Sequence, residues 1–194
     1  MLDNRIFLRA TLAVICCSAF PMIVVGCYFV HIPWNMERLD IGERDLGLAI
    51  LVFGIFFLIS NQFSARFLVP RIGTKIVMSF AMILISFATV LLVIVPNYQL
   101  FLICSIPAGL GWGSSGPIGG IHAQLIEQHS KKIITPYYAM GFNIGIFLGG
   151  ILAAYFLNND FTPWKIFLIL AFLSIAVSSL IYNYSLPKEM DFKG

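Results

Sequence analysis

Six long apolar blocks, separated by short polar links, constrain this 194-residue chain more than any other feature of its sequence. No Asp, Glu, Lys or Arg lies well inside a block, and a charge at the centre of a membrane helix costs about 3 kcal/mol on insertion scales. Each block also supplies the roughly 20 residues that a spanning helix needs. We therefore predict an all-α polytopic membrane protein, with residues 1–194 forming one six-helix transmembrane domain. The expected spans are at about 10–30, 46–65, 76–95, 99–128, 136–157 and 164–184.

Composition excludes several other classes of protein. Hydrophobic residues make up 59% of the chain and charged residues only 11%, against about 25% charged residues in a soluble domain. A soluble domain could not cover so much apolar surface, and a disordered chain needs more charge. The net charge of +3, with no basic run, excludes nucleic-acid binding. The four cysteines lie in apolar blocks without metal-site spacing, so no metal and no cofactor is predicted.

Lysine and arginine are divided unequally between the two sides that six alternating spans would create. One side carries nine of them: Arg5, Arg9, Arg66, Arg71, Lys75, Lys131, Lys132, Lys188 and Lys193. The other side carries three: Arg38, Arg44 and Lys165. Because cytoplasmic links are enriched in Lys and Arg, we expect both termini to be cytoplasmic, in a cell membrane.

The link after the second block carries the first recognisable motif. Residues 66–75 read RFLVPRIGTK, and basic residues around a glycine predict a tight turn on the cytoplasmic face. This link resembles the signature G-x-L-A-D-R-x-G-R-[KR] of the major facilitator superfamily of secondary transporters, at Leu68, Arg71, Gly73 and Lys75. Pro70 replaces the family's Asp, which helps to latch two halves of the transporter together, so that latch is not expected here.

The fourth block is rich in glycine and serine. Helical spacing places four glycines on one stripe that we expect to pack against another helix: Gly109, Gly113, Gly116 and Gly120. Roughly the opposite face carries Ser114, Ser115 and His122, which either face a solute cavity or are satisfied inside the bundle. In the family this helix often holds an Arg four residues before a G-x-G. Ser105 takes that place, so His122 becomes the candidate proton carrier.

The fifth block resembles another pattern of the family, G-x-x-x-G-P-x-x-G-G. Gly141, Gly145 and Gly149 are retained and are expected to pack against a helix, while Ile146 replaces the proline associated with antiporters. Asn143 points away from this glycine stripe. It is a further solute-cavity candidate, with a hydrogen bond to a neighbouring helix as the alternative.

Glu127 lies at the cytoplasmic end of the fourth block, where the family also places a Glu. We expect it to neutralise Arg71 or Lys75 across the cytoplasmic face. A weak, exposed surface pair is the alternative.

The Gly-Ser-Ser-Gly run in the fourth of six spans also invites comparison with rhomboid intramembrane serine proteases. Those enzymes place a histidine in the sixth span, and residues 164–184 contain none. His122 lies about 10 Å along the helix from Ser115, whereas a base must come within about 3 Å of its nucleophile. We therefore predict no enzyme. A membrane scaffold or assembly partner stays open as the alternative to a transporter.

The family resemblance covers essentially the whole chain, but only as the N-terminal six-helix half of the fold, and fucose-permease-like members are closest in general look. It implies secondary transport of a small organic solute, with protons as the coupling ion. The lack of charged cavity residues predicts a neutral or weakly charged solute. Family members form their site between two halves. Two alternatives stay open: a chain that is truncated or inactive alone, or one that assembles with a second copy or a separately encoded second half.

Overall fold

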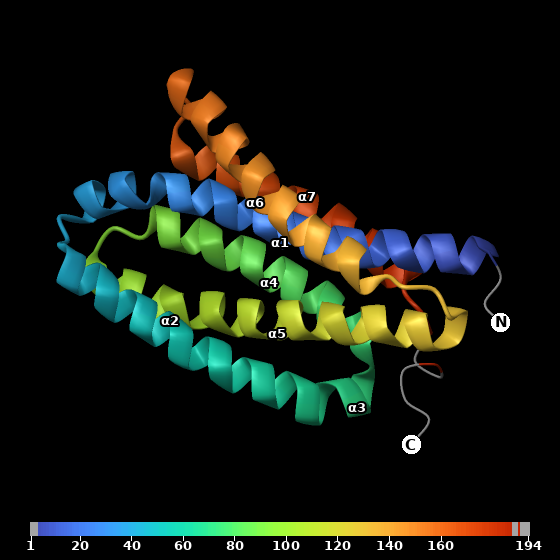
Figure 1. Cartoon of the computed structure of the whole chain (residues 1–194). Coiled ribbons are helices and arrows are strands. Elements are labelled where there is room, and N and C mark those ends of the chain that lie inside the picture. Colours follow the sequence, from blue (N-terminus) through green and yellow to red (C-terminus); the bar gives the residue numbers. More distant parts are fainter. Residues whose placement is uncertain (1–3, 188–189, 191–194) are drawn as a thin grey trace.

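The fold is a bundle of long helices, which confirms the all-α prediction. The computed structural model describes residues 4–187 and 190, and six long helices in it coincide with the six apolar blocks (Figure 1). They are α1 (Asn4–Leu39), α2 (Glu43–Phe63), α4 (Thr74–Ile94), α5 (Tyr98–Ser130), α6 (Thr135–Asn158) and α7 (Pro163–Tyr184). The helix α1 extends nine residues beyond the predicted end at residue 30, which places Arg38 in its last turn instead of in a link.

Five helices in the described part of the chain are long and apolar enough to cross a membrane: α1, α2 with its continuation to Ile72, α4, α6 and α7. The helix α5 is not among them although it has 33 residues. Its glycines and serines lower its hydropathy.

The expected turn over residues 66–75 is wrong in extent, because this segment is almost entirely helical. The helix α2 continues through a π-helical turn, η1 (Ser64–Leu68), and a short helix, α3 (Val69–Ile72), so Leu68 and Arg71 are helical residues. The chain reverses at Gly73, whose φ of 88° and ψ of 157° are essentially restricted to glycine. Lys75 already lies in the first turn of α4.

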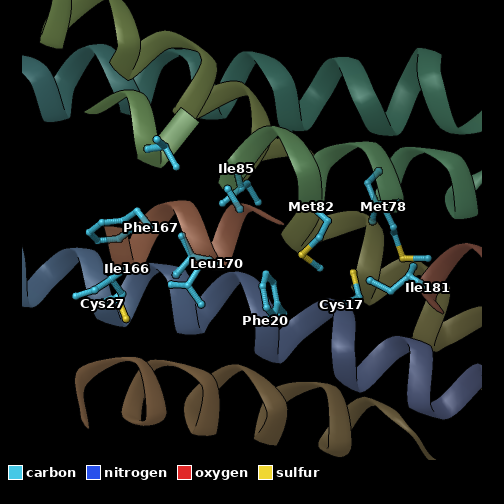
Figure 2. Close-up of a cluster of buried hydrophobic side chains, with 14 of the residues drawn as sticks. Cys17, Phe20, Cys27, Met78, Met82, Ile85, Ile166, Phe167, Leu170 and Ile181 are labelled. Carbon is cyan, nitrogen blue, oxygen red and sulfur yellow. The ribbon is translucent and has the colours of Figure 1, made fainter. Parts of the chain in front are cut away.

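The core lies where α1, α4 and α7 meet. Figure 2 shows Phe20, Met82 and Phe167 reaching into it from these three helices. Met78, Met82 and Phe167 are almost completely buried. These contacts leave α2 and α6 on the flanks of the bundle.

The helix α6 packs on α1 through glycines. An added Cβ at Gly145 would overlap the carbonyl oxygen of Ala19, and one at Gly149 would overlap that of Ile23. Gly141 lies equally close to Ser18. Because only glycine permits this backbone approach, the three glycines lie at the helix contact, as the sequence pattern predicts.

The helix α2 packs on α5 through a shorter glycine contact. Gly109 and Gly113 lie against the carbonyl oxygens of Phe53 and Phe57, respectively. The single stripe predicted for α5 is wrong for Gly116 and Gly120, since a Cβ at either position would meet no described atom within 4 Å.

The two ends of the bundle differ in charge. At one end, which we call the basic end, α1 begins and α7 ends: the Arg9 guanidinium lies 5.6 Å from the centre of the Tyr184 ring. Lys75 Nζ lies 4.0 Å from the centre of the Tyr182 ring at the same end. The opposite end, which we call the acidic end, holds the α1–α2, α4–α5 and α6–α7 links (Figure 1). Its acidic residues are Glu37, Asp40, Glu43, Asp45 and Asp160.

The α1–α6 contact generates a prediction with a neighbouring control. Gly149→Ala should lower the free energy of unfolding by about 1–3 kcal/mol, because the methyl group overpacks against the backbone of α1. Gly150→Ala should leave stability unchanged or raise it by up to about 1 kcal/mol, since nothing lies within 4 Å and alanine favours the helix. Thermal unfolding of both variants in detergent measures the difference. Equal melting temperatures would contradict a backbone contact at Gly149.

Candidate functional site

A cavity of about 400 Å³ lies between α1, α2, α4 and α5, in the part of the bundle nearer the acidic end. Its wall is formed almost wholly by apolar side chains: Val25, Tyr28, Phe29, Ile32, Leu46, Ala49, Ile50, Phe53, Thr89, Leu92, Phe101, Ser105, Ala108 and Trp112. Binding pockets for small molecules have this size and this mainly apolar lining.

The cavity is bounded by the α2–α5 contact. The Phe53 and Trp112 rings meet edge to face at 6.0 Å, in the same part of the interface as Gly109 and Gly113. The small side chains of Ala49, Ser105 and Ala108 line the cavity beside this contact. Small residues thus leave the space that larger ones would fill.

The serine and threonine hydroxyls in the wall are already satisfied by the backbone. Thr89 Oγ1 donates to the Ile85 carbonyl oxygen at 2.8 Å, and Ser105 Oγ donates to that of Phe101 at 3.0 Å. Each bond runs to the preceding turn of the same helix, the usual arrangement for such residues in apolar surroundings. The wall is therefore chemically more apolar than its composition implies.

A polar cluster adjoins the cavity at the acidic end. Asn35 and Arg38 follow the cavity-lining residue Tyr28 further along α1, toward the acidic end. Asn35 Nδ2 donates to the carbonyl oxygen of Leu92, another lining residue, at 3.2 Å. We did not predict this cluster, because the first span was expected to end at residue 30. A helical Asn35-x-x-Arg38 spacing was the only signal for it.

None of the four predicted cavity residues lines this cavity. Ser114 instead joins α5 to α2, because its Oγ lies 2.6 Å from Ser60 Oγ and 2.8 Å from Ser64 Oγ. These three hydroxyls lie where η1 begins. They join the two helices, and Ser114 does not line the cavity described above.

Ser115 and His122 are likewise buried inside the bundle. Ser115 Oγ donates to the Trp112 carbonyl oxygen at 3.4 Å. His122 is fully buried, with Nδ1 2.7 Å from Thr74 Oγ1 and Nε2 accepting the Leu186 N–H at 3.2 Å. Because Nε2 accepts, the hydrogen of the neutral ring is on Nδ1. Neither residue lines the cavity described above, and the two form no nucleophile–base pair.

Asn143 lies on the exposed surface of α6, away from the cavity. Its Nδ2 donates to the Ala139 carbonyl oxygen of the same helix at 3.0 Å. Asn143 therefore does not line the cavity described above.

Glu127 caps a helix, and its expected pairing with Arg71 or Lys75 stays a prediction. The N–H groups of Ile134 and Thr135, at the start of α6, donate to its Oε1 at 2.5 and 2.7 Å. The first turn of a helix leaves such N–H groups without partners, and a carboxylate satisfies them. Glu127 thereby fixes the α5–α6 link.

Among the described residues, no group of three or more His, Cys, Asp or Glu side chains is arranged to hold a metal ion.

Comparison with known proteins identifies a family. The family model described as Major Facilitator Superfamily matches residues 14–192 of the chain. A search of curated proteins finds no match. The matched range includes all the cavity-lining residues and the polar cluster beside them.

Proposed function

We propose a transport function for this chain, which belongs to the major facilitator superfamily. Members of this family transport solutes across membranes. This chain would contribute to secondary transport of a small organic solute bound in the cavity between α1, α2, α4 and α5. The cavity is the observation that supports this proposal most strongly. It has the right size for a small molecule and adjoins a polar cluster that would orient the bound molecule. Its apolar wall favours a solute with a substantial apolar part.

Transport requires the cavity to lie within the bilayer, and we propose that all six long helices span it. The helix α5 would cross as the sixth span. Its 33 residues extend about 50 Å, more than the hydrocarbon thickness. Its low hydropathy is compatible with this position because α2 and α4 shield much of it from lipid, as the contacts of Gly109 with Phe53 and of Gly111 with Ile85 indicate.

We also propose that the basic end is cytoplasmic. Arg9, Lys75 and Lys132 gather there, while Glu37 and Asp160 lie at the opposite end. Positively charged residues are retained on the cytoplasmic side during insertion. Coupling to protons rests on the family resemblance alone, because His122, the candidate proton carrier, makes structural contacts remote from the cavity lining.

A second six-helix unit would complete the transport path, either a second copy or a separately encoded half. The outer faces of α2 and α6 support this proposal. Only 11% and 22% of their most apolar 18-residue windows are buried, against 67% for α4. Family members bind solute between two halves, so these flanking helices are available for the contact.

The cavity proposal predicts the effect of filling it. Ala49→Phe should abolish binding of a neutral aromatic probe, 4-phenylbutanamide, because the ring would occupy the space beside Phe53. Ala176→Phe, on the exposed face of α7, should bind normally. Quenching of tryptophan fluorescence, to which the lining residue Trp112 contributes, follows binding to the purified chain. Binding to both variants with equal affinity would contradict this site.

The orientation predicts which ends react with an impermeant maleimide in intact cells. Asp160→Cys should be labelled from outside, and Lys132→Cys only after the membrane is opened. The reverse labelling pattern would contradict a cytoplasmic basic end.

The two-unit proposal predicts the mass and activity of the chain in lipid nanodiscs and vesicles. Native mass spectrometry should find either twice the mass of one chain or a monomer. In the second case, vesicles that contain the chain should take up solute only when a second half is added. Uptake of a labelled panel, comprising a hexose, an amino acid, a monocarboxylate and an aromatic amide, reports activity against protein-free vesicles. A strict monomer that transports alone would contradict the proposal.

A further inference from the structure

Resting on the proposed function, we propose that the cavity selects an amphipathic monoanion, with its apolar body between α1, α2 and α5 and its carboxylate against Arg38 at the acidic end. This replaces the neutral or weakly charged solute expected from the sequence with an anionic one. It follows from the position of Arg38. The sequence alone predicts this residue in a link outside the first span, whereas the structure places it beside the cavity.

Arg38 is held in a fixed position in the last turn of α1. Its Nη1 donates to the Val95 carbonyl oxygen at 2.6 Å, and its Nε and Nη2 donate to Asn35 Oδ1 at 3.3 and 2.8 Å. The Trp34 ring lies 5.2 Å from the guanidinium carbon. A guanidinium has five N–H donors, so two remain for a ligand.

Asn35 is the residue that positions this guanidinium. It is 97% buried, and its amide is used at both ends, because Nδ2 donates to Leu92 while Oδ1 accepts from Arg38. Its orientation is therefore fixed. A binding group whose geometry is held in advance loses less entropy when a ligand arrives.

The charge of Arg38 is only partly compensated by the protein. Its partners are carbonyl and amide oxygens, and no ion pair joins it to a carboxylate among the residues described. The carbonyls at the end of α4 carry the partial negative charge of a helix C-terminus, roughly half a unit charge. The guanidinium is thus a local cation beside the cavity, where low-dielectric walls strengthen its effect, and none of the acidic residues of this end lines the cavity.

The cavity and the cation are joined by Tyr28. Its ring lines the cavity and is fixed edge to face against Phe167 at 6.2 Å, and Asn35 and Arg38 lie on the same helix toward the acidic end. A solute that fills the apolar space can therefore direct an acidic group toward this end. Planar guanidinium and carboxylate match each other, and bonds between ionised groups are roughly twice as strong as neutral ones.

A matched pair of probes tests the inference on the purified full chain in detergent. The anion 4-phenylbutanoate and its neutral amide, 4-phenylbutanamide, differ only in the head group. We expect the anion to bind roughly tenfold more tightly at pH 7. Arg38→Gln, which retains a donor for the Val95 carbonyl, should abolish this preference by weakening binding of the anion. Tyr28→Phe should weaken anion binding by about fivefold, as loss of one hydrogen bond implies.

The controls separate this inference from the proposed function. Arg44→Gln removes an exposed arginine from the same end and should keep the preference for the anion. Equal binding of anion and amide by the wild-type chain, or a preference that survives Arg38→Gln, would overturn the inference while leaving the cavity as a solute site. Binding of neither probe would overturn both.

A lipid headgroup could present similar chemistry to Arg38, and a further measurement distinguishes it from a soluble solute. Binding of 4-phenylbutanoate should be the same in nanodiscs of phosphatidylcholine and in nanodiscs that also contain phosphatidylglycerol. If the anionic lipid displaces the probe, the site belongs to a lipid headgroup and the solute assignment fails.

Discussion

The close approach of helix backbones at glycines is the interaction on which the rest of this structure depends. Lipid tails are as apolar as the helix surfaces, so helices in a membrane associate through packing and hydrogen bonds. Gly145 and Gly149 bring α6 onto α1, and Gly109 and Gly113 bring α2 onto α5. Each contact sets a glycine against a backbone carbonyl of the partner helix. Together they place α2 and α6 on the flanks and leave room for a cavity between α2 and the core helices.

Several polar side chains in the bundle interior hold helices together. The Ser60, Ser64 and Ser114 hydroxyls join α2 to α5, and His122 joins α5 to Thr74 and Leu186. Such groups are satisfied because an unpaired polar atom in apolar surroundings is costly. Arg38 differs from them because its full charge faces only neutral oxygen atoms and it adjoins an open space. That combination makes it the candidate for recognising a solute.

Patterns of single residue types predicted the fold well and the site poorly. The Gly141, Gly145 and Gly149 repeat correctly marked a helix contact, because its i, i+4 spacing repeats on one face regardless of the neighbour. The same rule failed for Gly116 and Gly120, which lie beyond the point where α2 touches α5. Ser114, His122 and Asn143 were attractive as polar residues in apolar blocks. Their hydrogen-bond partners lie either far away in the sequence or in the preceding turn of the same helix. The sequence alone could not show whether such a partner or a solute would satisfy these side chains.

The sequence by itself determined that this chain forms six long helices and that basic residues gather at one end, because apolar length and charge are local properties that each segment carries alone. The family resemblance also came from local motifs and is now shown by the match over residues 14–192. Only the tertiary structure decided where the cavity lies and which residues line it. It also brought Arg38 and Tyr28 of α1 together with Leu92 and Val95 of α4. That juxtaposition depends on how the helices cross, which the glycine contacts and the core fix jointly and no single segment encodes.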